Sequence, residues 1–463
     1  MSRAAPATGV LSRLFRPVDI ASLVFFRVAF GALMLWEVIH YFGAGWIDRY
    51  FVAPRFHFTF PGFSWVTPWP APWMHVHFFV LGVLAVCIML GLWYRIAAFL
   101  FLVGFTYVFL LDQARYLNHF YLVSLVSFLL CIVPAHRAGS LDVLRRPRLH
   151  SRAAPAWSLW LLRFQMGIVY LYGGVAKLNA DWLGGEPVRT WIAEKTGFPL
   201  VGRYFTEEWM VHLVAWGGML LDLLVVPLLL WRRTRAIALL AAFVFHIANS
   251  QLFRIGIFPW LAAAATLLYL PPDWPRLRWL RRAGPAPAVE SGVPMPAFGR
   301  RQRVLVGVLG AWVLLQVLIP LRPYLHPGNP SWNEEGHYFA WHMKLHHKDC
   351  RGGFAATSRT SGERWEVPIR EFLAPWQIRQ MLARPDLILQ FSHHVADHYR
   401  RSGRGEVAVR AEIWCSLNAR EPRLLVDPTV DLAGEERLCF RRYSWVLSLE
   451  APARVGSAPH PAH

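Results

Sequence analysis

Long apolar runs alternate with short polar segments over the first 325 positions of the chain. A helix needs about 20 residues to cross the hydrocarbon core of a bilayer, and nine runs are this long or nearly so. The third, fourth and eighth runs are short, so the pattern predicts eight or nine transmembrane helices. The predicted spans are 19–44, 74–93, 95–111, 117–134, 157–178, 208–231, 236–254, 256–271 and 303–325.

From about residue 326 the chain becomes polar and its apolar period changes. The segment "GGFAATSRTSGERWEVPI" predicts a β-hairpin, and "VAVRAEIWCSLNAREPRLLVDPTVDL" predicts two strands around a turn. A helical stretch, 371–401, lies between them. We therefore expect a mainly α protein, with a polytopic membrane helix bundle at 1–325 and a β-rich α+β domain at 326–463.

The composition agrees with a membrane protein. Hydrophobic residues make up 55% of the chain and charged residues only 17%, whereas soluble proteins carry about a quarter charged residues. The net charge of +19 comes from arginines that cluster between the apolar runs. That distribution indicates membrane topology rather than a phosphate-binding stripe, so no nucleic-acid partner is predicted. Because cytoplasmic loops carry the basic excess, we expect a multi-pass cell-membrane protein with a cytoplasmic N-terminus and an extracytoplasmic C-terminal domain.

Polar residues gather near the outer ends of several predicted spans. In this topology Asn118 and His119 open one span, and Lys177 ends another. His246 and Asn249 lie one helical turn apart in the outer half of a third. Ionisable groups inside spans are rare and often mark a functional path, although interhelical hydrogen bonds are the simpler explanation for lone histidines and asparagines.

Lys177 is unusual because only four of the 48 Lys and Arg residues are lysines. A lysine at a helix end is commonly a snorkelling anchor, and this alternative stays open. Unlike arginine, however, a lysine in apolar surroundings can lose its proton and act as a base. We therefore predict that Lys177 is a catalytic base. Deeper in the spans, Arg163 and Asp222 are predicted to form a structural ion pair.

The cysteines give limited information. Three of the five, Cys350, Cys415 and Cys439, lie in the predicted outer domain and allow one disulfide there without indicating its pairing. The segment "WHMKLHHKDC" would place His342, His346 and Cys350 on one strand face, as at a metal site. No second ligand pair follows at a known spacing, so no metal site is predicted.

Several motifs resemble one known family. The segment "YLYGGVAKLNADWL" (170–183) resembles the Gly-Val-x-Lys-Leu-x-Ala-Asp-Trp motif of the vitamin K-dependent γ-carboxylases, within the wider HTTM family of membrane proteins. The resemblance covers most of the chain in order, and the arginine-rich, lysine-poor composition indicates a bacterial member. Further matching segments are "ASLVFFRVAFG" (21–31), "YVFLLDQARYLNHFYL" (107–122), "FHIANSQLFRIGIFPW" (245–260), "GHYFAWHM" (336–343), "IWCSLNAR" (413–420) and "DPTVDL" (427–432).

The resemblance implies an enzyme, a vitamin K-dependent γ-glutamyl carboxylase that is also an epoxidase. In that family O2 oxidises vitamin K hydroquinone to the epoxide, a strongly basic oxygenated intermediate removes the γ-proton of a peptide glutamate, and CO2 adds at that carbon. By resemblance, Lys177 matches the lysine that deprotonates the hydroquinone, and Asn118 with His119 matches the pair beside it.

The same resemblance implies two further groups of residues. The cofactor pocket would include His246, Asn249 and Met343. The group associated with the glutamate-bearing peptide would comprise Arg420, Trp332, Tyr338 and Trp341. Arg420 would bind the substrate carboxylate. The aromatic residues have an alternative role as the core of the β-domain, since strand alternation alone would bury Trp341.

The implied co-substrates are a hydroquinone of the menaquinone or phylloquinone type, O2 and CO2. The implied partners are a glutamate-containing peptide or protein, and the membrane lipid with its quinone. Two other functions remain open. One is a quinol epoxidase or oxygenase without peptide carboxylation, and the other is a non-enzymatic transporter or lipid-binding membrane protein. The sequence does not indicate the oligomeric state.

Overall fold

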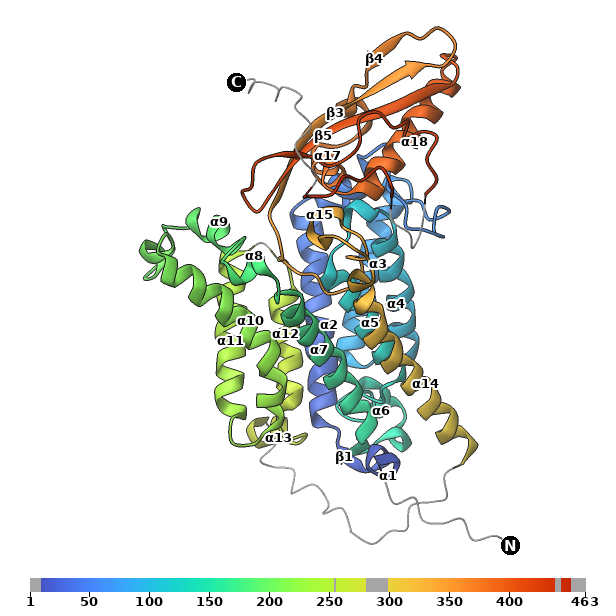
Figure 1. The fold of residues 1–463 in the computed structure, drawn as a ribbon. Coiled ribbons are helices and arrows are strands. Elements are labelled where there is room, and N and C mark those ends of the chain that lie inside the picture. Colours follow the sequence, from blue (N-terminus) through green and yellow to red (C-terminus); the bar gives the residue numbers. More distant parts are fainter. Residues whose placement is uncertain (1–9, 254, 280–298, 438–442, 451–463) are drawn as a thin grey trace, which may run out of the picture.

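The computed structural model describes residues 10–253, 255–279, 299–437 and 443–450 (Figure 1). A long helical bundle carries a small α/β domain at one end, called here the domain end. The opposite, far end holds α1 (Val10–Phe15), β1 (Pro17–Asp19) and α13 (Trp274–Trp279). The prediction of a mainly helical membrane-type fold with a C-terminal sheet domain is confirmed.

Every predicted span is a helix in the structure. Within the described residues, six helices are long and apolar enough to cross a membrane: α2 (Ala21–Gly43), α3 (Ala71–Leu90), α7 (Ala156–Ala176), α10 (Glu208–Leu230), α11 (Arg235–Leu252) and α14 (Arg300–Leu318), which continues as a 3-10 helix, Ile319–Leu325. The three runs noted as short are the shorter apolar helices: α4 (Tyr94–Leu110), α5 (Asn118–Ile132) and α12 (Phe258–Thr266), the last extended by a 3-10 turn, Leu267–Tyr269.

Short elements connect the long helices. The short helices are α6 (Leu141–Arg145), α8 (Ala180–Leu183), α9 (Val188–Ala193) and α15 (Pro330–Asn333). One π-helical turn, Asp48–Val52, and three 3-10 turns, Gln113–Arg115, Pro147–Leu149 and Gly202–Tyr204, complete the connections. At the far end β2 (Ala153–Pro155) pairs antiparallel with β1 and ties the start of α7 to the start of α2.

Small residues set the closest helix contacts in the bundle. A Cβ added to Gly31 on α2 would lie 2.6 Å from the backbone nitrogen of Met89 on α3, and one added to Gly174 on α7 would lie 2.7 Å from Cγ of Leu223 on α10. Membrane helices approach closely where a small residue leaves room for the neighbour. Gly174 therefore fixes α7 against α10 at the level where the candidate site lies.

The C-terminal domain is built on a four-stranded antiparallel sheet in the order β4-β3-β5-β6. Its strands are β3 (Lys348–Ser358), β4 (Arg364–Glu366), β5 (Val407–Leu417) and β6 (Arg423–Leu424). The predicted hairpin is the β3–β4 pair, and the two strands around a turn are β5 and β6. The predicted helical stretch is three helices, α16 (Ile369–Phe372), α17 (Pro375–Leu382) and α18 (Pro385–Arg401), because a proline starts each of the last two.

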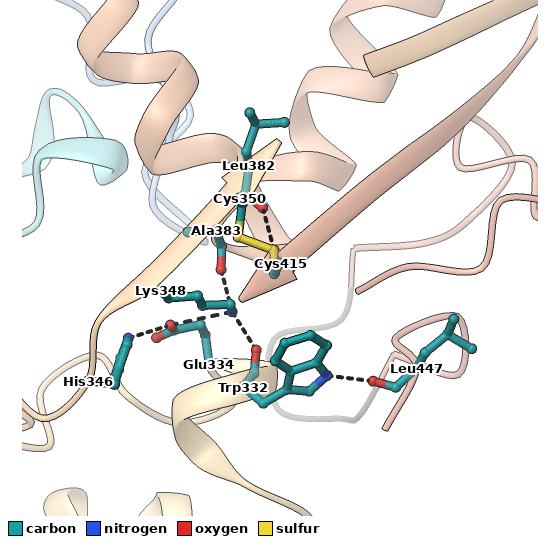
Figure 2. The surroundings of a disulfide bond; sticks show 9 residues. All are labelled: Trp332, Glu334, His346, Lys348, Cys350, Leu382, Ala383, Cys415 and Leu447. Atoms are coloured by element: carbon teal, nitrogen blue, oxygen red, sulfur yellow. Dashed lines mark hydrogen bonds and ion pairs between the residues drawn. A yellow bond between two sulfur atoms is a disulfide. The ribbon is translucent and has the colours of Figure 1, made fainter. Parts of the chain in front are cut away.

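A disulfide joins the two long strands of this sheet. Cys350 on β3 lies directly opposite Cys415 on β5, and their sulfur atoms are bonded (Figure 2). Cys439, the third cysteine of the domain, lies outside the described residues.

The domain is hydrogen-bonded to the loop between α4 and α5. Gln377 on α17 donates through Nε2 to Asp112 Oδ2 at 2.9 Å, and Gln113 donates through Nε2 to Asp386 Oδ2 on α18 at 2.8 Å. Burial raises the pKa of Asp112, and the His57 ring beside it opposes that shift. These buried polar contacts hold the domain over the ends of the helices that carry the candidate site.

Candidate functional site

One face of α7 carries three residues of the candidate site. Tyr170, Gly173 and Lys177 are spaced by three and four residues, so they lie along one side of the helix. Lys177 follows the last helical residue, and its side chain points back along the helix, where Nζ donates to the Gly173 carbonyl at 3.0 Å. Only 6% of Lys177 is exposed. A snorkelling anchor would extend to the surface, whereas this lysine is inside the bundle.

The partner of Lys177 is Asp222 on α10. Lys177 Nζ lies 2.6 Å from Asp222 Oδ2, and Asp222 is also only 6% exposed. The predicted Arg163–Asp222 ion pair is therefore wrong. Arg163 instead donates through Nε to the Leu268 carbonyl at 2.8 Å and through Nη2 to the Leu270 carbonyl at 3.1 Å, which caps the end of the α12 segment.

The segment before β3 covers this ion pair from the domain end. A Cβ added to Gly173 would lie 3.5 Å from both Met343 Cε and Asp222 Oδ2, and 4.0 Å from Lys177 Nζ. Gly173 thus leaves room for the thioether of Met343 beside the ion pair. Met343 was predicted as a cofactor-binding residue, and the structure brings it next to Lys177.

Asn118 reaches the same segment from α5. Its Nδ2 donates to the backbone carbonyl of His342 at 2.9 Å, and its Oδ1 accepts from the Tyr116 hydroxyl at 3.0 Å. His342 precedes Met343, so Asn118 binds the residue next to the one that covers Gly173 and Asp222. His119 packs elsewhere on α5, against Gly256, where an added Cβ would lie 3.2 Å from its Nε2.

His246 on α11 is hydrogen-bonded to α7 at Tyr170, seven residues before Lys177. Its Nε2 lies 2.6 Å from the Tyr170 hydroxyl, which also lies 3.1 Å from Thr266 Oγ1. His246 is 2% exposed, and its Nδ1 has no hydrogen-bond partner among the described residues. Asn249 lies one turn further along α11, is half-buried, and makes no hydrogen bond to Lys177 or Asp222 within the described chain.

A cavity of about 560 Å³ opens above the end of α7, between the bundle and the C-terminal domain. We call it the domain-end cavity. Residues following Lys177 form its floor, and the C-terminal domain forms its roof. Its polar lining includes Asn179, Asp181, Asn329, Ser331, His342 and Asn418.

Arg420 lies at the edge of this cavity and already holds a carboxylate. Its Nη1 donates to Asp181 Oδ2 at 2.8 Å, its Nη2 donates to Asp181 Oδ1, and Asn418 Nδ2 donates to Asp181 Oδ2 at 2.7 Å. The Arg420 guanidinium holds the pKa of Asp181 below its usual range. Asn418 and Ala419 have positive φ angles of 52° and 60°, which turns the chain after β5 toward α8.

The three predicted aromatic residues have different surroundings. Trp332 is buried in the wall of the domain-end cavity and donates through Nε1 to the Leu447 carbonyl at 2.7 Å. Tyr338 and Trp341 do not line this cavity. The Tyr338 hydroxyl donates to Asp386 Oδ2 at 3.1 Å, and the fully buried Trp341 ring packs against Tyr121.

The predicted strand face at 341–350 is wrong. β3 begins only at Lys348, and Trp341 and Lys344 have positive φ angles of 59° and 50°, which break the alternation of an extended chain. Trp341 is buried, as the alternative core role expected, but a turn rather than a strand buries it. Cys350 is in the disulfide, and His346 Nε2 lies 3.0 Å from Glu334 Oε1, so the three residues of the apparent metal pattern have different partners.

A buried charged cluster fixes this segment to the sheet (Figure 2). Lys348 Nζ lies 3.6 Å from Glu334 Oε1 and donates to the carbonyls of Ala383, at 2.7 Å, and Trp332. Burial lowers the pKa of Lys348 to about 8, and the Glu334 carboxylate opposes that shift. The cluster holds Trp332 and His346 in place immediately beside the disulfide.

Two acidic residues of the site were not predicted. Asp222 was assigned to Arg163, and Asp181 was noted only as part of a motif. The scarcity of acids in α10 was the available signal for Asp222, since a buried lysine requires an anionic partner. For Asp181 the sequence contains no comparable signal, because its partner Arg420 is 239 residues away.

Two family models match the chain. The model described as HTTM domain matches residues 15–274, and the model described as vitamin K-dependent gamma-carboxylase, lumenal domain, matches residues 301–452. The second match begins within α14 and includes the whole sheet domain. No solved structure matches the chain.

Proposed function

Since the chain belongs to the vitamin K-dependent γ-carboxylase family, we propose that it carboxylates peptide glutamate in a reaction driven by oxidation of vitamin K hydroquinone, with Lys177 as the base that starts it. The observation that carries the proposal is the buried Lys177–Asp222 pair, 2.6 Å apart and covered by Met343. Vitamin K hydroquinone, when bound and oxidised by O2, supplies the strong base that the glutamate γ-proton requires.

The proton chemistry follows from the burial of the pair. Removing two opposite charges from water costs several kcal/mol for each ion, and their attraction has to offset that cost. Within this pair Asp222 Oδ2 lies 2.6 Å from Nζ and is positioned to share its proton. Asp222 Oδ2 can take the proton of Nζ, which leaves Lys177 as a neutral amine that accepts a hydroxyl proton. Arginine does not lose its proton at any relevant pH.

The residues around the pair suit a hydroquinone. The Lys177–Asp222 pair accepts one proton, and the Met343 methyl group supplies an apolar surface against an aromatic ring. His246 Nδ1, which has no partner in the described part of the chain, is available for a hydrogen bond to a polar group of the ligand. Asn118 and His119 keep their predicted roles beside the quinol, and the support for Asn118 is its bond to the residue before Met343.

The domain-end cavity is the proposed glutamate site. It lies directly above the helix end that carries Lys177, and it is lined by polar side chains from both parts of the molecule. A peptide bound there would approach the reacting quinol from water, while the quinol would enter from the bilayer. Arg420, Asn418 and Trp332 border or line this space. The bond of the half-buried Tyr338 to Asp386 and the buried position of Trp341 favour structural roles for these two residues.

The proposed orientation places the C-terminal domain outside the cytoplasm. The arginine-rich segments cluster on the opposite side of the predicted spans, as cytoplasmic loops do. The Cys350–Cys415 disulfide gives independent support, because disulfides persist mainly in oxidising compartments.

One observation favours the alternative of a quinol epoxidase without carboxylation. Arg420, the predicted partner of the substrate glutamate, is already bound to Asp181 through both terminal guanidinium nitrogens. A substrate carboxylate would have to displace Asp181 or bind beside it. Purified protein given vitamin K hydroquinone, O2, labelled bicarbonate and a glutamate peptide separates the two functions. The proposal expects both epoxide and fixed label, and epoxide alone would support the alternative.

Replacing Arg420 should affect the two products differently. Arg420→Ala leaves the Asp181 carboxylate unpaired in the wall of the cavity, where it repels a glutamate. We expect fixation of labelled CO2 to fall about tenfold, which is the cost of one charge-assisted hydrogen bond. Epoxide formation should stay within about twofold, a change too small to reflect a lost contact of that kind.

The matched control is Arg410→Ala, which removes an arginine of the same sheet that donates to the Thr429 carbonyl. The double variant Asp181→Asn/Arg420→Ala removes the repulsion as well. Recovery of fixation in the double variant would show that Arg420 only neutralises Asp181, and persistent loss would show that it binds the substrate. Equal loss of both products in Arg420→Ala would contradict a role at the glutamate site.

A further inference from the structure

A groove runs along the membrane-facing side of the bundle between α7 and α10. Its volume is about 370 Å³. Most of its lining is apolar, and the contributing side chains include Trp160, Phe164 and Leu171 from α7 and Leu223, Val226 and Leu230 from α10. We call it the α7–α10 groove. Trp160, Leu171 and Leu230 are more than two-fifths exposed, so the groove opens toward lipid.

The polar groups in the groove already have partners. Arg163 donates to two backbone carbonyls, and the Tyr269 hydroxyl donates to the Arg163 carbonyl at 2.6 Å. Asp222 is bound to Lys177. The wall therefore offers mainly hydrocarbon contacts, which suits an apolar chain.

The missing side chain of Gly167 keeps the groove open. A Cβ at this position would lie 3.2 Å from the Tyr269 hydroxyl and 3.6 Å from Val226 Cγ1. A larger residue would fill the space between the two helices at this level. The stretch from Trp160 to Leu171 is ~17 Å long at the rise of an α-helix, so the groove follows most of the apolar length of α7.

The end of the groove nearest the domain is the Lys177–Asp222 pair. Asp222 lines the groove, and its Oδ2 is the atom that holds Lys177 Nζ. A ligand lying in the groove with its polar end toward the domain would bring that end to the proposed base. A phospholipid headgroup is charged and needs water, whereas a quinol head is small and neutral and tolerates a buried site.

Resting on the proposed function, we propose that the α7–α10 groove is the lateral entry and the seat of the isoprenoid tail of the quinol. The tail lies along Phe164, Gly167 and Val226, and the head points toward Lys177 and Asp222. The groove then selects substrates by their tail, while the ion pair acts on their hydroxyl group.

Photolabelling tests the location without turnover. The probe is an oxidised menaquinone analogue with a diazirine at the end of its tail, added to the full-length protein in lipid nanodiscs. We expect label on the peptides that contain 160–171 and 223–230, and we expect excess unlabelled menaquinone to remove it. Label on other helices, or displacement by added phospholipid as effectively as by menaquinone, would overturn the proposal.

Two groove-filling variants test its effect on the substrate. Val226→Trp and Leu171→Trp add bulk in an open, lipid-facing space. We expect the KM for a long-tailed hydroquinone to rise about tenfold, because apolar contacts of the tail are lost. The KM for menadiol, which has no tail, should stay within about twofold. The control is Leu224→Trp, at an exposed position of α10 outside the groove, which should change neither value.

The outcomes separate this inference from the proposed function. If wild-type protein makes no epoxide but is labelled in the groove, the proposed chemistry is wrong and the tail site stands. If epoxide forms but both quinols respond equally to the tryptophan variants, or neither responds, the tail site is wrong and the chemistry stands.

Discussion

Replacing Lys177 with alanine should lower epoxide formation at least about 100-fold, the usual contribution of a positioned base. Lys177→Arg should not restore it, because the guanidinium keeps its proton. The buried position of Lys177 against Asp222 is the reason for expecting so large an effect. The measurement is the initial rate of epoxide formation from vitamin K hydroquinone by purified, folded protein.

Lys195→Ala is the matched control, because Lys195 is an exposed lysine in the segment between α7 and α10. It should leave the rate unchanged. Small primary amines should partly restore Lys177→Ala, since they supply the missing proton acceptor, and should not affect Lys177→Arg, whose larger side chain fills the site. A fully active Lys177→Arg protein would show that the position needs only a positive charge, as an anchor does, and not a base.

Removing the carboxylate of Asp222 should impair both stability and activity. Asp222→Ala leaves a buried ammonium without a partner, and breaking a buried ion pair in this way costs about 3–5 kcal/mol. The gentler variant Asp222→Asn keeps the shape of the side chain but cannot take up the proton of Nζ. We expect its epoxidation rate to fall at least about tenfold, within the usual range for a lost proton acceptor. Thermal unfolding and the rate are measured on the same preparations.

A double variant separates a chemical from a structural role of Asp222. The double variant Lys177→Met/Asp222→Leu should recover much of the lost stability, because a buried pair can be replaced by apolar residues, but none of the activity. A double variant that regained the stability and also kept the activity would mean that the pair only supports the fold.

The large features of the fold could be predicted from local pattern. Apolar runs of membrane length became helices because a backbone in lipid must satisfy its hydrogen bonds within the segment. In the C-terminal domain the period-two pattern of 407–417 gave β5, and the hairpin before it was also recognisable. The short predicted spans were also located correctly, as α5 and α12 show.

The candidate site was only partly predictable because it depends on contacts between distant segments. Lys177 was singled out by residue type, and Met343 by resemblance. Their placement on the same side of Gly173 required the turn at 339–347, where positive φ angles override the strand pattern. The partner of Lys177 was missed because Asp222 and Arg163, two opposite charges deeper in the spans, were paired with each other. The lysine side chain points back down its helix and reaches Asp222.

The measurement that tests the central claim most directly is release of tritium from a peptide labelled at the glutamate γ-carbon. It records cleavage of the C–H bond itself. Wild-type protein should release tritium to water only when vitamin K hydroquinone and O2 are both present, and Lys177→Ala should release none above background. Release that does not require hydroquinone, or epoxide formation by the wild-type protein without any release, would contradict a Lys177-initiated carboxylase.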